Sequence, residues 1–390
     1  MKRNDAGKVS RRIPDICKTN IRESVIRQVL RCMTAIIFII LMTFTAGCFA
    51  MKPTEDTISN LSFSHDGKTV VFDRCRDGEC GIQVYDLATG ELAAYQSPKN
   101  EQWTMGKYSY DGKRIAFSVI PIRPDDSFDL GNMQIAVMDS DGKNLKKVTT
   151  GPGAKLYPAF SHNGKKILYA CAAHIRKSGG TPASQYDAWE VHLETGAQTR
   201  LTYFEYFYMG YLTYFPDDER FLYHGELPGV YEGLRVHPDE KAFGRKMVEL
   251  ERQGRGIHGV VVMKGRELIP GVYNFGEKVR AEHPLLSRDG SVMIFEKSVS
   301  AGKFYRYSED GNHHFAGGGG SIDSAAISPD GDLLAVTYGK TINIYWVKDG
   351  KLKVQFYNLA ATHMENWDND IRKYPRKQKV IPDQPSKIYN

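Results

Sequence analysis

The sequence lacks the local motifs by which several classes of enzyme are recognised. No Gly-x-Ser-x-Gly nucleophile elbow is present, and the run GGGGS at residues 317–321 has no glycine after its serine. The 11 histidines show no spacing typical of metal ligands. Residues 139–142 resemble the start of a calcium-binding loop but lack the downstream bidentate glutamate. The sequence by itself therefore favours no catalytic chemistry.

The sequence also lacks an excess of positive charge outside its first 47 residues. The formal net charge of the whole chain is +6. Residues 1–47 carry nine basic and three acidic side chains, and the remaining 43 basic and 43 acidic side chains cancel. Nucleic-acid binding depends on a clustered surplus of lysine and arginine. We therefore expect no nucleic-acid partner.

Long hydrophobic runs are absent except for one, at residues 32–51, which contain no charged side chain. A run of this length after a basic segment is typical of a signal segment or a membrane anchor. It ends in Thr45-Ala46-Gly47-Cys48, which resembles the lipobox of bacterial lipoproteins, where the cysteine is acylated and becomes the mature N-terminus. The resemblance implies a leader at residues 1–47, with an apolar helix, and lipid on Cys48, followed by a linker at 48–57.

An uncleaved transmembrane anchor is the alternative interpretation of the same run, because twenty residues suffice to span a bilayer. Both interpretations agree on sidedness. The basic segment stays in the cytoplasm and sends the following chain across the membrane. We therefore expect the body of the protein to be extracytoplasmic and membrane-anchored, on the periplasmic side of the cell envelope.

Cysteine is scarce, with six residues in the chain, of which Cys17 and Cys32 precede the predicted cleavage site. Cys75 and Cys80 flank a four-residue segment between two predicted strands, so they face each other across a hairpin. An oxidising compartment permits a bridge between them. We predict a Cys75–Cys80 disulfide, with chance spacing or half of a metal site as alternatives, and a buried thiol at Cys171.

One short phrase occurs six times and is the most regular feature of the chain. It consists of an apolar residue, serine, a variable residue, aspartate and glycine, and its copies begin at Phe63, Tyr108, Phe160, Tyr214, Leu286 and Ile327. The fourth copy departs most, because Phe215 and Asp218 replace the serine and the glycine. The spacings of 41 to 72 residues indicate one supersecondary unit copied with variable loops, as in propellers.

Each copy lies within the pattern of a four-stranded antiparallel sheet. In the first unit, short apolar strands at residues 61–63, 69–72, 82–86 and 91–95 are separated by turn residues. Similar units begin near Trp103, Ala154, Met209, Ala281 and Ile322. We predict an all-β, six-bladed β-propeller of four-stranded blades over residues 58–358, a short helical insertion in blade four from Pro238 to Arg252, and a C-terminal tail at 359–390.

The units resemble the TolB-type, WD-like propeller repeat. In that pattern the Ser-x-Asp-Gly turn leads through an apolar strand to a strand ending in aspartate, as in Ile135–Asp139, and closes with Leu-Thr, as in Leu201-Thr202. The resemblance covers residues 58 to about 358 and implies the propeller fold. Scaffolds, peptidase propellers and sugar lyases all contain this repeat, so the resemblance does not assign an activity.

The loops between second and third strands emerge on one face of a propeller, together with the connections between blades. These loops are long in blades two, three and four, at residues 118–132, 171–187 and 225–256. Insertions in repeat proteins commonly mark the binding face. We expect this face to contain the binding residues Arg123, Arg176, Lys177, Tyr206, Phe207, Tyr208 and His283. Solvated loops, and rings that only fill the space between blades, are the plainer alternative.

These observations predict a membrane-tethered, extracytoplasmic propeller that acts as a non-catalytic, protein-binding scaffold in the bacterial envelope. We expect no cofactor and no metal, and an envelope protein as the partner. The resemblance supplies an alternative, because related sugar lyases use channel-facing histidines with a divalent metal. His283 starts an inner strand near the channel mouth. An oligouronate lyase or a carbohydrate-binding protein is therefore the second interpretation.

Overall fold

A computed structural model of the chain describes residues 57–76, 79–175, 183–226, 258–273, 275, 281–297, 302–356 and 379–380. The predicted leader with Cys48, the helix expected at residues 238–252 and most of the C-terminal tail lie outside these ranges. Within them, no helix is both long enough and apolar enough to cross a membrane.

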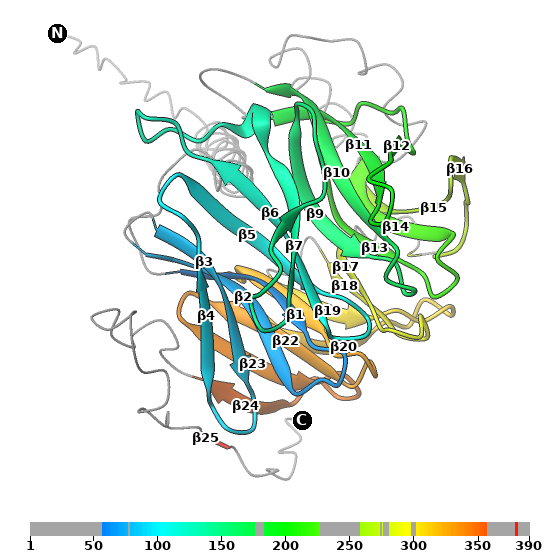
Figure 1. Ribbon diagram of the computed structural model, residues 1–390. Coiled ribbons are helices and arrows are strands. Elements are labelled where there is room, and N and C mark those ends of the chain that lie inside the picture. The colour runs from blue at the N-terminus through cyan, green and yellow to red at the C-terminus, as the bar shows by residue number, and fades with distance from the viewer. Residues whose placement is uncertain are drawn as a thin grey trace, which may run out of the picture. The chain divides into compact units, whose positions relative to one another are not determined.

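The described strands form six antiparallel sheets, five of four strands and one of five (Figure 1). Blade one contains β1 (Thr57–Phe63), β2 (Thr69–Arg76), β3 (Glu79–Asp86) and β4 (Leu92–Gln96). Blade two contains β5 (Glu101–Tyr108), β6 (Arg114–Pro121), β7 (Gln134–Asp139) and β8 (Lys146–Lys147). Blade three contains β9 (Ala154–Phe160), β10 (Lys166–Ile175), β11 (Ala183–His192) and β12 (Gln198–Arg200).

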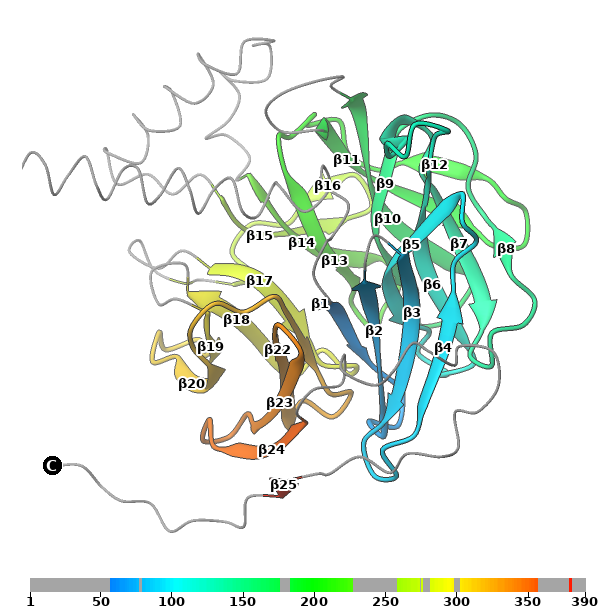
Figure 2. The same cartoon turned by 90° about the vertical axis from the view of Figure 1, so that its left-hand side faces the viewer.

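Blade four contains β13 (Met209–Tyr214), β14 (Arg220–Glu226), β15 (His258–Lys264) and β16 (Glu267–Leu268). Blade five contains β17 (Ala281–Leu286), β18 (Met293–Lys297), β19 (Lys303–Arg306) and β20 (His314–Gly318). Blade six contains β21 (Ser324–Ile327), β22 (Leu333–Tyr338), β23 (Thr341–Trp346) and β24 (Leu352–Phe356), and β25 (Lys379–Val380) pairs with β24. Figure 2 shows the blades from a second side.

The prediction of an all-β, six-bladed propeller with four-stranded antiparallel blades is confirmed. The inner strands of blades two to six begin within two residues of the predicted starts. One expected loop is partly strand instead. Residues 171–175 and 183–187 continue β10 and β11, because the two strands keep their antiparallel hydrogen bonding up to the pair Ile175 and Ala183.

The repeated phrase builds the same hydrogen-bonded turn in five of the six blades. In blade one, Ser64 Oγ donates to Asp66 Oδ1 at 2.7 Å and accepts from Thr69 N at 3.0 Å. The same serine contact recurs for the pairs Ser109–Asp111, Ser161–Asn163, Ser287–Asp289 and Ser328–Asp330. The glycine that follows has positive φ, 70° at Gly67, where a side chain would be strained. Serine, aspartate and glycine therefore repeat because each has one role in the turn.

Blade four departs from this turn because its substituted residue binds the neighbouring blade. Asp218 takes the position of the glycine with φ of 56°. Its carboxylate accepts hydrogen bonds from the backbone N–H of His162 and from that of Asn163, the latter at 3.0 Å. The strain of a positive φ is thus offset by two charge-assisted bonds to the turn of blade three.

Five inner strands contain a bulge at the same place. The residue with positive φ in each bulge is Asn60, Met105, Tyr157, Tyr211 or His283, with φ between 48° and 61°. Thirteen residues further along, in the second strand of the same blade, stand Asp73, Ser118, Ala170, His224 and Glu296 respectively. The bulge is therefore a second structural feature that recurs from blade to blade, and its side chain differs in each copy.

The ring is closed by packing between the first and last blades. Ile58 and Leu61 of blade one lie in one buried cluster with Ile342 and Phe356 of blade six. The rings of Tyr85 and Phe356 meet edge to face with centroids 5.2 Å apart. Among the described residues, each four-stranded blade takes its strands from one continuous stretch of chain. Burial of apolar surface thus joins blades one and six.

Candidate functional site

Three histidines, on β14, β15 and β17, lie close together where blade four meets blade five. The ring centroid of His224 lies 6.0 Å from that of His258 and 5.4 Å from that of His283. His224 and His283 occupy two of the repeated positions described above, the second-strand position of blade four and the bulge of blade five. We call His224, His258 and His283 the histidine cluster.

His224 is the buried member of the histidine cluster. It is 5% exposed, and neither of its ring nitrogens has a hydrogen-bond partner among the described residues. The rings of Tyr208 and Tyr211 lie around it, with centroids 5.3 Å and 6.4 Å away. Burial holds the pKa of His224 well below its usual value, and the nearby His283 and His258 act in the same direction. The ring is therefore neutral at pH 7.

His283 is held by a carboxylate. Its Nδ1 lies 2.6 Å from Oε2 of Glu296, and Glu296 Oε1 accepts from Gly302 N at 3.0 Å. The ring of Tyr211 packs against His283 with a centroid distance of 4.4 Å. This pair corresponds by position to Asn60 and Asp73 of blade one, also thirteen residues apart. A carboxylate on Nδ1 fixes the orientation of an imidazole, as is common for a histidine that acts as a general base.

Glu226 follows His224 by two residues on β14 and is fully buried. One carboxylate oxygen accepts from Tyr208 N at 3.0 Å and lies 3.5 Å from Nε2 of His258. Burial raises the pKa of Glu226, while the hydrogen bond from His258 opposes that rise. His258 and His283 are thus each engaged by a different glutamate.

A metal ion would need several of these side chains to converge on one point. The described residues contain no group of three or more histidine, cysteine, aspartate or glutamate side chains arranged to hold a metal. The two outer histidines use a ring nitrogen on Glu296 and on Glu226 instead. The described residues of the histidine cluster by themselves therefore show no site for the divalent metal of the lyase interpretation.

A second candidate site is a raised rim on blades two and three, formed by residues 122–133 with the hairpin end at 172–175 and 183–186. Arg123 is exposed, and its guanidinium donates to Asp129 Oδ1 at 2.7 Å and to the carbonyl of Phe128 at 3.3 Å. The loop ends in a short 3-10 turn, η2 (Leu130–Asn132), next to Ile175 of the hairpin. The two loops thus form one ordered surface.

The aromatic run between blades three and four divides between surface and core. Tyr206 is only 2% exposed and pairs through its backbone with Tyr186, so its ring fills the space between blades instead of facing a partner. Phe207 and Tyr208 are half-buried, and Tyr208 packs against the histidine cluster. Tyr203 is 49% exposed, with the guanidinium of Arg200 4.5 Å from its ring centroid.

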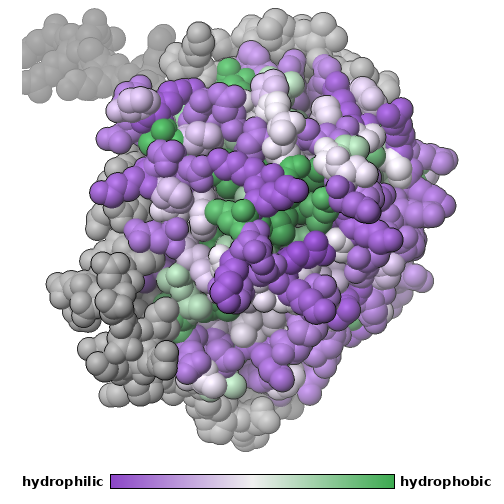
Figure 3. Space-filling model, in the orientation of Figure 1, coloured by the Kyte–Doolittle hydropathy of each residue, from purple (hydrophilic) through white to green (hydrophobic). Residues whose placement is uncertain are grey.

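Arg176, Lys177 and Cys48 lie outside the described residues. The molecular surface seen in Figure 3 is mostly hydrophilic, with hydrophobic residues gathered near the middle of the view. Within the described part of the chain, the large hydrophobic side chains that are exposed are Leu145, Tyr203, Leu268 and Phe315. These four side chains lie far apart in the sequence.

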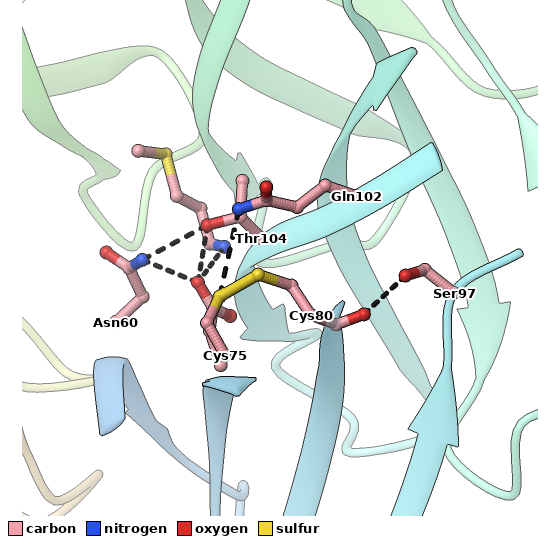
Figure 4. Close-up of a disulfide and its surroundings, with 8 residues drawn as sticks. Asn60, Cys75, Cys80, Ser97, Gln102 and Thr104 are labelled. Atoms are coloured by element: carbon pink, nitrogen blue, oxygen red, sulfur yellow. Dashed lines mark hydrogen bonds between the residues drawn. A yellow bond between two sulfur atoms is a disulfide. The ribbon is translucent and has the colours of Figure 1, made fainter. Parts of the chain in front are cut away.

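Cys75 and Cys80 form a disulfide across the hairpin of β2 and β3 (Figure 4). Gln102 Nε2 lies 3.8 Å from Cys75 Sγ, and Ser97 Oγ donates to the carbonyl of Cys80. Cys171 is a buried free thiol, and burial raises its pKa.

Asp73, two residues before Cys75 on β2, has a buried carboxylate. Asp73 accepts from Asn60 Nδ2 at 2.5 Å, from Thr104 Oγ1 at 2.6 Å and from Met105 N at 2.6 Å. Gly106 N adds a contact at 3.3 Å. Burial raises the pKa of Asp73 to about 6 although these hydrogen bonds lower it. Asp73 therefore joins blade one to blade two.

The motif search did not find the histidine cluster, although a signal was present. His224, His258 and His283 have no fixed sequence spacing, because they come from three strands and a long insertion separates two of them. Aligning the blades on their bulges would have placed His224 and His283 at repeated inner positions. The sequence does not show that the two residues lie across one blade boundary.

No family model matches the chain, and no curated protein matches it in sequence. Among solved structures, the chain is similar to TolB from Acinetobacter baumannii, with 17% identity, a TM-score of 0.44, and coverage of 66% of this chain and 53% of that one. It is similar to an oligogalacturonate lyase in complex with manganese, with 16% identity, a TM-score of 0.47, and coverage of 77% and 78%.

A putative TolB from Agrobacterium tumefaciens is similar with 18% identity, a TM-score of 0.47, and coverage of 71% of this chain and 88% of that one. The chain spans about half the length of the Acinetobacter protein. The described residues form a six-bladed propeller, and the likeness to these proteins concerns the fold alone.

Proposed function

We propose that the chain is a membrane-tethered, extracytoplasmic propeller that binds a partner protein through the raised rim and catalyses no reaction itself. The location rests on the leader sequence, in which a basic segment precedes the uncharged residues 32–51 and Cys48. A disulfide between Cys75 and Cys80 agrees with a compartment in which such bonds persist.

The hydrogen bonds within the raised rim support the binding part of the proposal. Arg123 and Asp129 fix the loop at 2.7 Å, and Ser127 Oγ donates to Asp125 Oδ1 at 2.6 Å. A surface that is already held in one conformation loses little entropy on binding. Arg123 and the exposed carboxylates beside it supply charge for a complementary partner.

Photo-crosslinking in cells tests which face meets the partner. A photoreactive phenylalanine analogue is placed at Pro124 or His174, both exposed on the raised rim. Matched control positions are Lys113 and Lys143, which are exposed in turns at the opposite ends of the strands. We expect discrete protein adducts from the rim positions only. Adducts of equal yield from both faces, or from the control positions alone, would contradict the proposal.

The tether is tested by the intact mass of the protein after extraction from membranes. We expect a mature chain that begins at Cys48 and is heavier by the mass of its acyl groups. A chain that retains the whole leader would indicate that a transmembrane anchor, and not a lipid, tethers the protein. A soluble chain without either would contradict the tether.

The histidine cluster supports a second candidate, a carbohydrate-binding protein or an oligouronate lyase. His283 with Glu296, at 2.6 Å, has the form of a general base next to the rings of Tyr211 and Tyr208. Incubation with oligouronates separates the candidates, with unsaturated product measured by absorbance. Product formation that disappears in His283→Ala but persists in His174→Ala would establish the lyase. Binding without product would establish the carbohydrate-binding protein.

A further inference from the structure

A cavity of about 160 Å³ lies on the axis of the propeller, surrounded by the inner strands of all six blades. The bulge residues Asn60, Met105, Tyr157 and Tyr211 line it. The repeated turns close around its other end, where His65 and Arg288 contribute to the lining. We call this space the axial cavity.

Most of the wall of the axial cavity is apolar. Leu61, Phe63, Phe160, Leu285 and Ala326 are among the lining residues, and each is buried in the fold. An apolar cavity of roughly 150 Å³ in another protein is large enough for one benzene molecule. The axial cavity therefore has room for a body of about that size.

The charged side chains among the described residues that line the axial cavity are all basic. Its ionisable lining residues, apart from tyrosines, are Lys107, His65 and Arg288, and the described residues that line it include no aspartate or glutamate. Lys107 Nζ donates to the carbonyl of Leu61 at 3.3 Å, and no described carboxylate lies within ion-pair distance of it. An ammonium group has three donors, so two remain for a ligand.

The setting of Lys107 favours an anion. Burial lowers the pKa of Lys107 to about 8, although the charge of Asp73 opposes this. The ammonium group is therefore mostly charged at pH 7 but poorly solvated. The carboxylate of Asp73 already accepts four hydrogen bonds and does not contact Lys107. An anion in the axial cavity would supply a counter-charge in direct contact with Lys107 in a low-dielectric setting.

We propose that the axial cavity binds a small organic carboxylate whose apolar body is about the size of a benzene ring, with the carboxylate on Lys107. The site is separate from the raised rim, and this inference does not depend on the proposed scaffold function. The apolar walls set the size of the body and Lys107 sets the sign of the charge.

Calorimetric titration of the intact protein with benzoate, benzyl alcohol and benzylammonium tests the proposal. These three probes have one ring in common and differ in charge. We expect benzoate to bind most tightly, with one molecule per chain, and benzylammonium not to bind. Lys107→Met should weaken benzoate binding by at least about tenfold, because it removes a charge-assisted hydrogen bond. Its effect on benzyl alcohol should be small.

Two further variants keep the test decisive. Lys113→Met removes an exposed lysine of the same blade and should leave benzoate binding unchanged. Ser62→Phe places a ring in the axial cavity and should abolish binding of both benzoate and benzyl alcohol. If Lys107→Met fails to fold, loss of benzoate binding in Ser62→Phe together with the order of the three probes still decides. Equal binding of all three probes, or no benzoate binding by the folded parent, would overturn the proposal.

Discussion

His224 meets His283 across the boundary between blades four and five, with ring centroids 5.4 Å apart and ring planes at 89°. Only one of the two has a carboxylate partner, because Glu296 lies on His283 while neither ring nitrogen of His224 is hydrogen-bonded among the described residues. Burial therefore disfavours a proton on His224. For this reason we expect the stability of the boundary to depend on pH.

We expect His224 to destabilise the protein in mild acid. Its folded pKa is well below its unfolded value of about 6.5, so its contribution is favourable above that pH and is lost as pH falls below it. The loss approaches about 1.4 kcal/mol per pH unit. Urea unfolding between pH 5 and pH 8 measures it as the difference between the parent and His224→Leu.

The control for this prediction is His174→Gln, which changes an exposed histidine on β10. We expect His224→Leu to gain stability relative to the parent as pH falls, and the control to follow the parent. A constant difference between parent and His224→Leu across the pH range would show that the His224 ring is not neutralised by burial.

The carboxylate of Asp73 should contribute much more to the free energy of unfolding than the hydroxyl of Ser118, which occupies the corresponding position in blade two. Asp73→Leu leaves the donors of Asn60, Thr104 and Met105 without an acceptor, and we expect a loss of at least about 3 kcal/mol. Ser118→Ala changes the corresponding position, whose hydroxyl has no hydrogen-bond partner among the residues that the structure describes, and should change stability by less than about 0.5 kcal/mol. Equal losses in urea unfolding would refute the role of Asp73.

Asp218 should stabilise the contact between blades three and four although it departs from the repeat. Asp218→Gly restores the repeat sequence but removes the bonds to His162 N and Asn163 N, and we expect a loss of about 1–3 kcal/mol. Asp218→Ala loses the same bonds and also strains a residue with φ of 56°, so it should lose about 1 kcal/mol more. A more stable Asp218→Gly variant would show that the contact contributes nothing.

The Cys75–Cys80 disulfide should be present in protein made in an oxidising compartment. Alkylation in denaturant without reductant should label Cys171 but neither Cys75 nor Cys80, since the latter two are bonded. Peptide mass mapping reads out the labels. The double variant Cys75→Ser with Cys80→Ser should lose about 2 kcal/mol, because the bridge closes only a short loop. Labelling of all three cysteines would contradict the bond.

The sequence predicted the blades well because each blade is local. Within one unit, the turn at Ser64, Asp66 and Gly67 uses residues only a few positions apart, and strand alternation follows from the same stretch of chain. The extent of the strands was less predictable. The strands β10 and β11 continue to Ile175 and Ala183 because they pair with each other, which depends on the hairpin and not on residue type.

Residues close together in the chain were enough to predict the repeat and the antiparallel blades, and the leader with Cys48 stays a prediction from the sequence. The side chains that meet across blade boundaries can be identified only from the tertiary structure. In it Tyr206 is buried, His224 lies against His283, and Lys107 lines the axial cavity, in which the described lining residues include no carboxylate. The reason is physical, since burial and charge pairing between blades depend on how the ring closes and not on the order of residues within one blade.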